Sequence, residues 1–239
     1  MPIFNMVGGG GYKSLGILWA QRSTLPDSFS NCPAVVLNNE IHILGGDGYE
    51  AYHYKWNGSI WKSVSTLPYD FYLGSAVVLN NEIHILGGAS YGYTKHYKWD
   101  GSNWTSVSTL PYDFYNGSAV VLNNEIHILG GTNNGTKHYK WDGSSWKSVS
   151  TLPYDFVAGS AVVLNNEIHI LGGEHRGYSD GFQYHYKWDG TTWTSVSTLP
   201  YAFDSGLAVV LNDEIHILSN NNSPNTKDHY SYGEVYTKA

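Results

Sequence analysis

The chain has 239 residues, of which 41% are hydrophobic, 15% aromatic and only 14% charged, and its net charge is -7. The charged fraction is well below the usual ~25%, so Asn, Ser, Thr and Tyr must supply most of the polar surface. The negative charge argues against a nucleic-acid partner. Two arginines, Arg22 and Arg176, are too few for a cluster that binds phosphate or carboxylate. Cys32 is the only cysteine, which excludes an intramolecular disulfide and a cysteine-based zinc site.

The N-terminal residues 1–29 are predicted to be the second half of a repeat. Their start lacks the basic end and the long apolar stretch of a secretory signal. No apolar run in the chain approaches the ~18 residues of a membrane-spanning helix, so membrane insertion is not expected. The segment from Phe4 to Gly9, and Tyr12, Gly16 and Trp19, align without gaps to positions in the repeats that follow.

One block of sequence recurs five times along the rest of the chain. It reads Ala-Val-Val-Leu-Asn-Asn-Glu-Ile-His-Ile-Leu-Gly-Gly at residues 34–46, and it returns at 76–88, 119–131 and 161–173, with a frayed copy at 208–220. A shared Ser-Thr-Leu-Pro block ends at prolines 26, 68, 111, 153 and 200, which are 42, 43, 42 and 47 residues apart. A fixed period of this length is typical of a repeat architecture.

Each repeat is predicted to begin with a tight hairpin. In the first complete repeat, Ala34–Leu37 (strand A) and Glu40–Leu44 (strand B) are short β-rich runs. They are joined by Asn38-Asn39, two residues that tolerate positive φ. Gly45-Gly46 then ends strand B and opens a loop.

A second hairpin completes the repeat. His53–Trp56 (strand C) leads into Asn57-Gly58, the strongest short hairpin signal, which recurs as Asp-Gly at residues 100–101, 142–143 and 189–190. Residues 60–65 (strand D) end before Leu67-Pro68, because proline cannot donate to a strand ladder. No segment shows apolar spacing of helical period, so each repeat is predicted to be a four-stranded antiparallel sheet.

Sheets of this kind bury both faces when they stack radially as the blades of a propeller. The fold class is therefore predicted to be all-β, with a single β-propeller domain over residues 1–239. Counting strands favours six blades, one of them short of a strand, and five blades closed by the strand of Trp19 are the alternative. The predicted boundaries are 1–29 for the N-terminal partial repeat, about 30–72, 73–115, 116–157 and 158–204 for the complete repeats, and 205–239 for the C-terminal partial repeat.

The repeats resemble those of the kelch family. Paired glycines that close strand B are followed by a Tyr and then a Trp, which in the first complete repeat are Gly45-Gly46, Tyr54 and Trp61. The resemblance covers nearly the whole chain and implies a kelch-type β-propeller. Similar near-identical arrays occur in bacterial and phage surface or tail proteins, which implies an extracellular or virion-exposed location for a chain of that kind. Two features depart from the family: the period is shorter than ~50 residues, and His42 and its equivalents replace a common Tyr in strand B.

Ten of the 11 histidines recur at two fixed positions in the repeats. Those of strand B are His42, His84, His127, His169 and His216, and those that open strand C are His53, His96, His138, His185 and His229. A metal ion needs ligands that converge within ~2.0–2.1 Å, whereas equivalent residues on separate blades are held apart around a ring. No metal site and no cofactor is predicted. The histidines are expected to pack between blades, with stability falling as the pH drops through the histidine range.

The repeats differ on one predicted face. The A–B and C–D turns barely vary, whereas the B–C and D–A loops on the opposite face differ in sequence and length. A constant frame with one variable, Tyr-rich face is typical of binding scaffolds. The D–A loops lead into the innermost strand, so they are expected to ring the mouth of a central channel. The candidate ligand-binding residues are Tyr69, Asp70, Tyr72, Tyr112, Asp113, Tyr115, Tyr154, Asp155, Tyr201 and Asp204 in these loops, and His175, Arg176, Tyr178 and Tyr184 in the longest B–C loop.

No catalytic residue is predicted. The nucleophile-elbow, P-loop, zincin and dinucleotide motifs are absent, and near-identical repeats spread the same groups evenly instead of forming an asymmetric catalytic set. The expected function is non-enzymatic recognition of a glycan or surface protein through the B–C/D–A face, with self-association through the incomplete terminal repeat as a further expectation. Two alternatives stay open: a kelch-like sugar-active enzyme of the epimerase or oxidase type, with a pocket near Glu174, and a ligand-free structural or designed scaffold.

Overall fold

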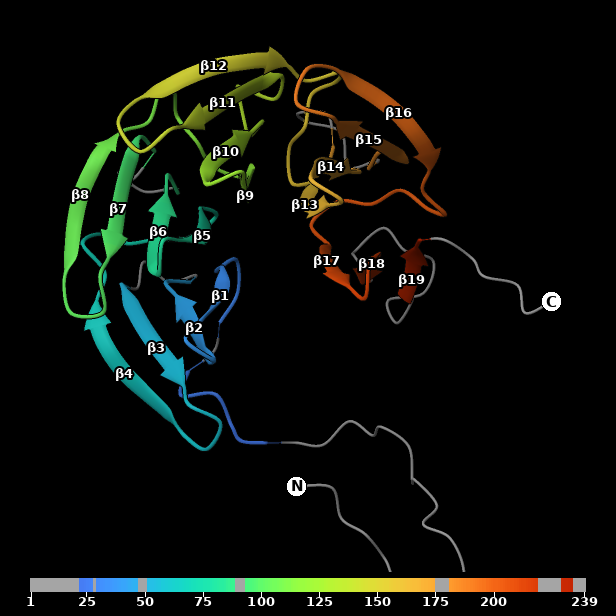
Figure 1. Cartoon of the computed structure of the whole chain (residues 1–239). Coiled ribbons are helices and arrows are strands. Elements are labelled where there is room, and N and C mark those ends of the chain that lie inside the picture. The colour runs from blue at the N-terminus through green and yellow to red at the C-terminus, as the bar shows by residue number, and fades with distance from the viewer. Residues whose placement is uncertain are drawn as a thin grey trace, which may run out of the picture.

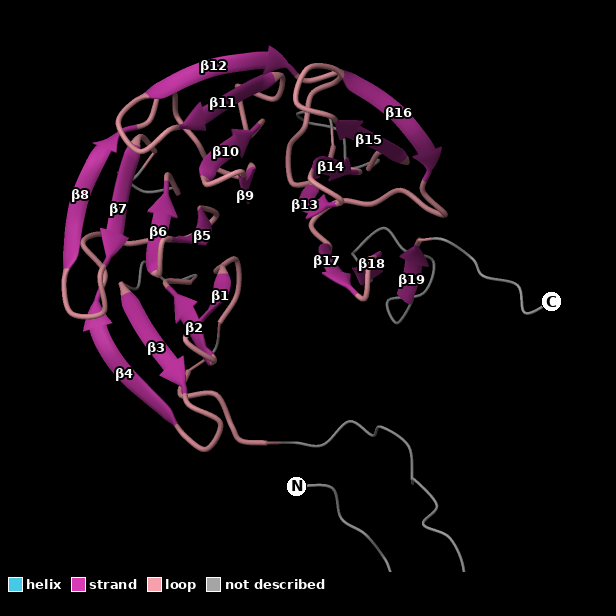
Figure 2. Ribbon diagram, in the orientation of Figure 1, coloured by secondary structure: helices cyan, strands magenta, loops and turns pink. Residues whose placement is uncertain are grey.

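The structure is a computed structural model that describes residues 22–27, 29–46, 51–88, 93–174, 181–218 and 229–233. Every regular element in these ranges is a β-strand, and the ranges hold no apolar helix of membrane-spanning length (Figure 2). The strands are β1 (Ala34–Leu37), β2 (Glu40–Leu44), β3 (Tyr52–Trp56), β4 (Trp61–Thr66), β5 (Ser75–Leu79), β6 (Glu82–Leu86), β7 (Lys95–Trp99), β8 (Trp104–Thr109), β9 (Ser118–Leu122), β10 (Glu125–Leu129), β11 (Lys137–Trp141), β12 (Trp146–Thr151), β13 (Ser160–Leu164), β14 (Glu167–Leu171), β15 (Tyr184–Trp188), β16 (Trp193–Thr198), β17 (Leu207–Leu211), β18 (Glu214–Leu218) and β19 (His229–Tyr232).

The strands form five sheets, each a simple antiparallel meander. Four sheets have four strands (β1–β4, β5–β8, β9–β12 and β13–β16), and the last has three (β17–β19). In Figure 1 the A strands (β1, β5, β9, β13 and β17) lie at the centre and the D strands (β4, β8, β12 and β16) on the outside. The sheets follow one another along an arc that stays open between the last sheet and the first. The prediction of a β-propeller built from four-stranded antiparallel blades is confirmed.

The preference for six blades was wrong, since the described residues form five. Each of the five sheets begins with its own inner strand A, and the sequence holds five copies of that strand. The sixth blade was inferred from a partial repeat at residues 1–29 that brings no strand A. Most of that segment, residues 1–21, lies outside the described ranges.

The predicted hairpins are present, because the chain supplies the residues that their turns need. Asn38 and Asn39, with φ of 50° and 63°, form the A–B turn of the first sheet, and the Asn pairs of the next three sheets have the same conformation. In the C–D turn of the second sheet, the Asp100 carboxylate accepts the backbone N–H groups of Ser102 and Asn103 at 2.8 Å each. Both turns are therefore fixed locally, and they hold the register of the strands on either side.

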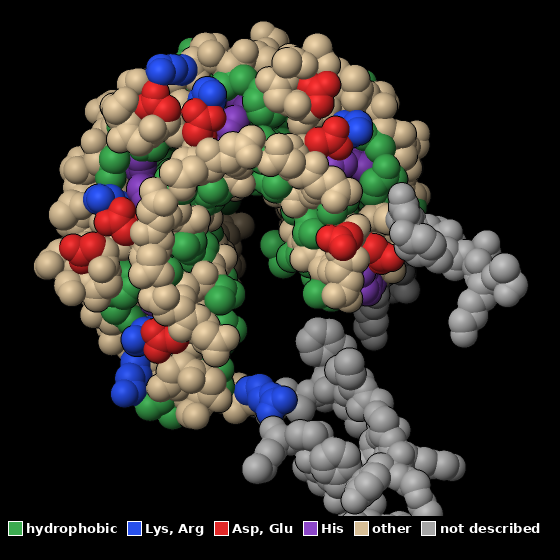
Figure 3. Space-filling view, viewed as in Figure 1, with side chains coloured by type: hydrophobic (Ala, Val, Ile, Leu, Met, Phe, Trp, Pro, Cys, Tyr) green, Lys and Arg blue, Asp and Glu red, His purple; other side chains and the backbone are tan. Residues whose placement is uncertain are grey.

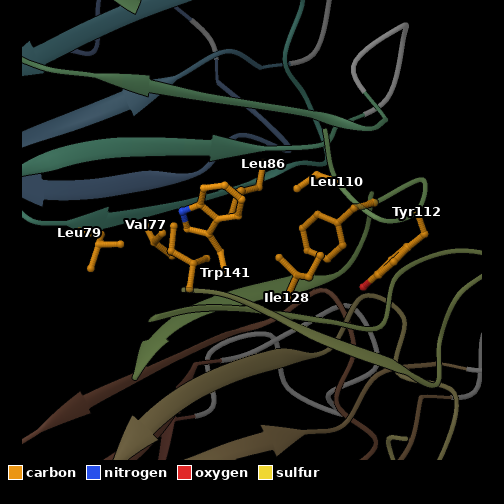
Figure 4. Packing of buried hydrophobic residues seen from close by; sticks show 9 residues of the cluster. Val77, Leu79, Leu86, Leu110, Tyr112, Ile128 and Trp141 are labelled. Carbon is orange, nitrogen blue, oxygen red and sulfur yellow. The ribbon is translucent and has the colours of Figure 1, made fainter. Parts of the chain in front are cut away.

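Apolar side chains of neighbouring sheets meet in a core at each junction. Figure 4 shows the core between the second and third sheets, where Val77, Leu79 and Leu86 face Ile128 and Trp141. A phenylalanine from the loop between consecutive sheets is completely buried at each of the four junctions, namely Phe71, Phe114, Phe156 and Phe203. Every sheet therefore depends on its neighbour for burial, as expected for stacked repeats.

The close approach of these phenylalanines requires glycine on the adjoining strand. Gly87 ends β6 with φ of +64°, and a Cβ at this position would collide with the carbonyl oxygen of Phe114. The N–H of Gly88 donates to that same carbonyl at 2.9 Å. The paired glycines therefore allow the end of β6 to form a backbone hydrogen bond with the loop that joins the second sheet to the third.

The repeated histidines form a hydrogen-bonded relay inside each of the first four sheets. In the first sheet, Nδ1 of His42 and Nε2 of His53 are 2.8 Å apart, and Nδ1 of His53 lies 2.8 Å from Oγ of Ser65. The indole N–H of Trp104, in the second sheet, donates to the same Ser65 Oγ at 3.0 Å. The relay joins strands B, C and D and continues into the next sheet. The expectation that these histidines pack between blades is confirmed for the first four sheets, whereas His229 of the last sheet is exposed.

Burial keeps the relay histidines neutral. His53 and His96 are fully buried, and desolvation lowers the pKa of each to about 3, with smaller contributions from the partner histidine and the nearby lysine. Beside the relay, Lys55 pairs with Glu40 at 2.8 Å, and equivalent pairs recur in the next three sheets. Figure 3 shows paired acidic and basic side chains next to histidines around the ring.

Stability is expected to fall as the pH drops below about 6.5. A histidine of the unfolded chain takes up its proton near pH 6.5, whereas the folded His53 and His96 have a pKa of about 3. The unfolded state therefore binds more protons in this window, and each such ring lowers the free energy of unfolding by about 1.4 kcal/mol per pH unit. Urea unfolding should show a lower midpoint at pH 5.0 than at pH 7.5, a window in which carboxylates titrate little. Equal midpoints would contradict the burial of neutral rings.

The variant Gly87→Ala is expected to lose far more stability than Gly101→Ala. Both glycines have positive φ, but a Cβ at Gly101 meets nothing within 4 Å, so that variant carries only the backbone strain of about 1–2 kcal/mol. Gly87→Ala adds the collision with Phe114, which can be relieved only by separating the two sheets. Thermal unfolding followed by circular dichroism checks this, and a similar midpoint for the two variants would count against a tight junction.

Candidate binding face

The D–A loops line a central cavity of about 320 Å³, as the sequence predicted. Its walls hold one residue of positive φ from each loop, and a backbone hydrogen bond joins each of these to the preceding one. The N–H groups of Leu73, Asn116, Ala158 and Ser205 donate to the carbonyls of Asn31, Leu73, Asn116 and Ala158 at 2.9, 2.9, 2.7 and 2.6 Å. A belt of backbone hydrogen bonds therefore surrounds the mouth, and the residues that form it are Asn31, Leu73, Asn116, Ala158 and Ser205.

The first tyrosine of each D–A loop lies away from this mouth. Tyr69, Tyr112 and Tyr201 are at most 9% exposed, and Tyr154 is half-buried. The hydroxyl of Tyr69 donates to the carbonyl of Gly87 at 2.8 Å, and Tyr112 and Tyr154 make the same bond to Gly130 and Gly172. Burial raises the pKa of the Tyr69 and Tyr112 hydroxyls. The geometry makes Tyr69, Tyr112 and Tyr154 part of the frame, because each ties its loop to strand B of the next sheet.

The other predicted residues of the D–A loops are spread over the face. Asp113 is exposed, Asp70 and Asp155 are half-buried, and Asp204 is only 7% exposed. Tyr72 and Tyr115 are half-buried, and the Tyr115 ring lies 5.2 Å from the exposed ring of Tyr93. The acidic residues therefore do not form one cluster with the tyrosines.

Four aromatic side chains gather between the third and fourth sheets. We call this group, Tyr154, Phe182, Tyr184 and Tyr186, the aromatic shelf. The rings of Phe182 and Tyr184 stack with centroids 4.9 Å apart and planes inclined by 23°. Tyr154 lies below them, 5.5 Å from Phe182 and 4.9 Å from Tyr184 in edge-to-face geometry. Of the predicted ligand-binding residues, the structure thus brings Tyr154 and Tyr184 together.

The shelf depends on the residue at the start of strand C, which is a tyrosine in the first and fourth sheets, and on the tyrosine beneath it, since the first repeat has Asp27 where Tyr154 precedes the fourth sheet. In the second and third sheets this position is lysine, and the ammonium groups of Lys95 and Lys137 lie 4.6 and 5.0 Å from the ring centres of Tyr69 and Tyr112. In the fourth sheet Tyr184 takes that place over Tyr154, and its side chain is 44% exposed. One substitution within the repeat therefore converts a covered tyrosine into an exposed aromatic surface.

A cavity of about 470 Å³ opens beside the shelf. Its walls combine Phe182, Tyr184 and Tyr186 with the polar side chains of Gln183, Ser195 and Thr198. Aromatic walls with a few polar groups are the usual composition of a small-ligand site. The sequence analysis missed Phe182 and Gln183. The signal that could have found them is their difference from Tyr93 and Thr94, and from Gly135 and Thr136, at the equivalent loop positions.

Two carboxylates lie at the edge of the same loop. Glu174 directly follows the glycine pair of the fourth sheet, and its N–H donates to the carbonyl of Val157 at 2.8 Å. Burial, and secondarily the charge of Asp204, raises the pKa of Glu174. His175, Arg176 and Tyr178, predicted to belong to this loop's binding surface, lie outside the described residues.

Other places in the described structure fit a ligand less well. A cavity of about 580 Å³ lies between the fourth and fifth sheets, lined by the ion pair of Glu167 and Lys187 and by Glu214, but it opens at the invariant A–B turns. Within the described ranges, no group of three or more His, Cys, Asp or Glu side chains is placed to hold a metal ion.

Comparison with known proteins shows the fold and nothing finer. No family model matches the chain, and no curated protein matches it. Among solved structures, the chain is similar to the one described as "Structure of YjhT", with a TM-score of 0.72 and 14% sequence identity over 80% of this chain and 72% of that chain. At this identity the likeness concerns the propeller architecture alone.

The hydroxyl of Tyr112 is expected to matter for stability, and that of Tyr184 is not. Tyr112→Phe removes the donor to the buried carbonyl of Gly130, and an unsatisfied buried group costs about 1–3 kcal/mol. Tyr184→Phe changes an exposed ring that keeps its stacking with Phe182. Urea unfolding of both variants checks this, and a Tyr112→Phe midpoint equal to that of the parent would show that the bond is dispensable.

Proposed function

We propose that the protein is a non-enzymatic recognition module that binds a glycan on the B–C/D–A face, with the aromatic shelf as its principal contact. The observation that carries this is the exposed Tyr184, stacked on Phe182, at the position where the second and third sheets have a lysine that covers the tyrosine beneath. Flat, rigid aromatic faces suit the apolar face of a sugar ring, because they bring contact area at little conformational cost. The hydroxyls of Ser195 and Thr198 offer hydrogen bonds to a sugar, as does the amide oxygen of Gln183, whose Nε2 donates to the carbonyl of Leu199 at 3.1 Å.

A kelch-type assignment of the repeats belongs to the same proposal. The glycine pairs that close strand B, with the following Tyr and Trp, support it, and each has a role in the sheet junctions. The Gly87 carbonyl accepts the hydroxyl of Tyr69, the ring of the motif residue Tyr97 lies 5.8 Å from that of Tyr69, and the Trp104 indole donates to Ser65 of the neighbouring sheet. Similar arrays occur in surface or tail proteins of bacteria or phages. A glycan-binding array of this kind would act as part of such a protein.

The arrangement of acids favours binding over catalysis. An enzyme that acts on a sugar needs an acid and a base that both reach the substrate. Asp204 is the carboxylate whose charge acts on Glu174, and it is only 7% exposed, so it does not reach a ligand on the shelf. Turnover of a bound sugar that depends on Glu174 would favour the enzyme alternative.

The double variant Phe182→Gly/Tyr184→Lys is expected to weaken glycan binding at least tenfold, or about 1.4 kcal/mol. Both new residues are those of the third repeat, Gly135 and Lys137, so the sheet should keep its fold. The Lys at 184 should also restore the contact over Tyr154 that Lys137 makes over Tyr112. A glycan array and a peptide array, probed with the parent and the variant, identify the ligand class, and titration calorimetry with the best binder gives the loss.

Tyr93→Gly is the matched control, because Tyr93 is the equivalent of Phe182 in the second repeat and its side chain is exposed. It should leave binding unchanged. Equal loss in the control and the double variant would indicate several equivalent sites in place of one shelf. Binding that survives the double variant, or binding to peptides alone, would contradict the proposal.

A further inference from the structure

The cavity of about 580 Å³ between the fourth and fifth sheets fits a glycan less well than the aromatic shelf, but its walls point to a different ligand. It opens at the A–B turns, which lie at the opposite ends of the A strands from the D–A loops. Three positions at which the fifth repeat departs from the others line this cavity. They are Asp213 in place of an asparagine, Tyr232 in place of a tryptophan, and Gly233 in place of an aspartate or asparagine.

The tyrosine is smaller than the tryptophan of the earlier repeats. At the first junction, the ring of Trp99 packs against His42 with ring centres 5.4 Å apart. At the fourth junction the equivalent ring is Tyr232, which packs against His185 at 4.8 Å. His169, the equivalent of His42, therefore lines the cavity.

His169 carries a buried ring nitrogen that no other group satisfies. Its side chain is only 3% exposed, and its Nδ1 lies 2.8 Å from Nε2 of His185. Of the histidines that the structure describes, it is the one with a buried nitrogen, Nε2, that has no hydrogen-bond partner. Burial lowers the pKa of His169, with smaller and opposite contributions from Glu167 and Lys187, so the ring is neutral. When Nδ1 carries the proton and donates to His185, Nε2 is left to accept a hydrogen bond from a ligand.

A carboxylate on the same wall lacks the lysine that its equivalents have. In each of the first four sheets the first glutamate of strand B pairs with a lysine of strand C, as Glu167 does with Lys187 at 3.0 Å. In the fifth sheet, Ser231 stands in the lysine's place, opposite His216 in the ladder. Glu214 therefore has no lysine partner in the described ranges, and it lies 3.8 Å from Nε2 of His216.

Gly233 gives this carboxylate its place. The other repeats have an aspartate or asparagine at the equivalent position. A Cβ at Gly233 would come within 2.5 Å of Cγ of Glu214, so the glutamate side chain lies in space that a larger residue would take. The substitution that widens the cavity therefore also brings Glu214 to its wall.

The cavity is acidic as a result. Its walls carry the carboxylates of Glu167, Asp213 and Glu214 against the single ammonium group of Lys187, which Glu167 already pairs. A ligand that is both a cation and a hydrogen-bond donor suits this wall, because it compensates the carboxylates and satisfies the nitrogen of His169. A metal ion suits it less, since no three His, Cys, Asp or Glu side chains of the described ranges are grouped to ligate one.

We propose that this cavity binds a primary ammonium group, carried by an amino sugar or by a lysine side chain. The ammonium group donates to Nε2 of His169 and to the carboxylate of Glu214, and Tyr232 adds an aromatic ring of the kind that attracts cations. The ligand's ammonium group thus stands in for the lysine that the other four sheets place on this glutamate.

A titration with butylamine tests the proposal. At pH 7.5 a primary amine is protonated, because its pKa is near the ~10.4 of lysine. In protein with nitrogen-labelled histidine, the NMR signal of His169 Nε2 should shift and saturate as the amine is added. Butanol, which has the same chain without the charge, should cause no shift. Glucosamine and Nα-acetyl-lysine methylamide, with N-acetylglucosamine as a neutral counterpart, then distinguish an amino sugar from a lysine side chain.

Three variants locate the binding group. Glu214→Gln should weaken butylamine binding about tenfold or more, because a hydrogen bond to a charged group contributes more than a neutral one. Glu82→Gln is the matched control, since it removes the same charge from a glutamate that Lys98 pairs, and it should leave the affinity unchanged. Ser231→Lys copies the other repeats, and it should abolish binding without lowering the thermal midpoint, because its side chain can pair with Glu214.

Each result decides the proposal. A saturable shift that requires the charge, that Glu214→Gln weakens and that Ser231→Lys abolishes supports it. A shift with butanol equal to that with butylamine, an unchanged affinity in Glu214→Gln or Ser231→Lys, or no shift with any amine would overturn it. Glycan binding at the aromatic shelf is measured separately, so failure of this proposal leaves the proposed function standing.

Discussion

The architecture depends on how each sheet satisfies the polar groups that it buries against the next. A pair of imidazoles buried between sheets is tolerated only when the rings are neutral and hydrogen-bonded. The bonds from His42 to His53, from His53 to Ser65 and from Trp104 to Ser65 meet that requirement in three strands and the following sheet. The same bonds fix the spacing of neighbouring sheets, because the indole of Trp104 in the second sheet must reach Ser65 in the first sheet. The packing of one sheet on the next and the hydrogen bonding of the buried polar groups therefore depend on the same contacts.

This frame explains why most of the Tyr-Asp-Phe loop is structural and only part of the face is free. Phe114 is completely buried beneath Gly87, and the Tyr112 hydroxyl is bonded to Gly130. Those two side chains fix the loop, and the belt of backbone hydrogen bonds fixes its inner edge. Variation is then confined to residues outside these bonds. The aromatic shelf arises at such a position, where Tyr184 takes the place of a lysine without disturbing the tyrosine beneath it.

Much of the fold could be predicted because the residues that form each hairpin lie close together in the sequence of the repeat. The Asn-Asn and Asp-Gly turns, the alternation of strand residues and the terminal prolines each act within a few positions, so strand order and sheet type were correct. The predicted number of blades was wrong. That number depends on whether a partial repeat forms its own sheet, which is decided by contacts between residues far apart in the sequence. The sequence placed the variable loops on one face, and two of the residues predicted there, Tyr184 and Tyr154, lie in the aromatic shelf. It did not separate exposed tyrosines from those, such as Tyr69, that serve the frame.

By itself, the sequence determined the all-β class, the four-stranded unit and the face on which repeats differ, because these follow from turns and periodicity that operate along the chain. Only the tertiary structure decided which aromatic side chains are available to a ligand. The reason is that the partner of Tyr112 is the carbonyl of Gly130, 18 positions away in the next sheet. The partner of Tyr184 is the ring of Tyr154, which belongs to the loop that joins the third sheet to the fourth. Contacts between sheets are set by stacking geometry, which the turns and periodicity of a single repeat do not contain.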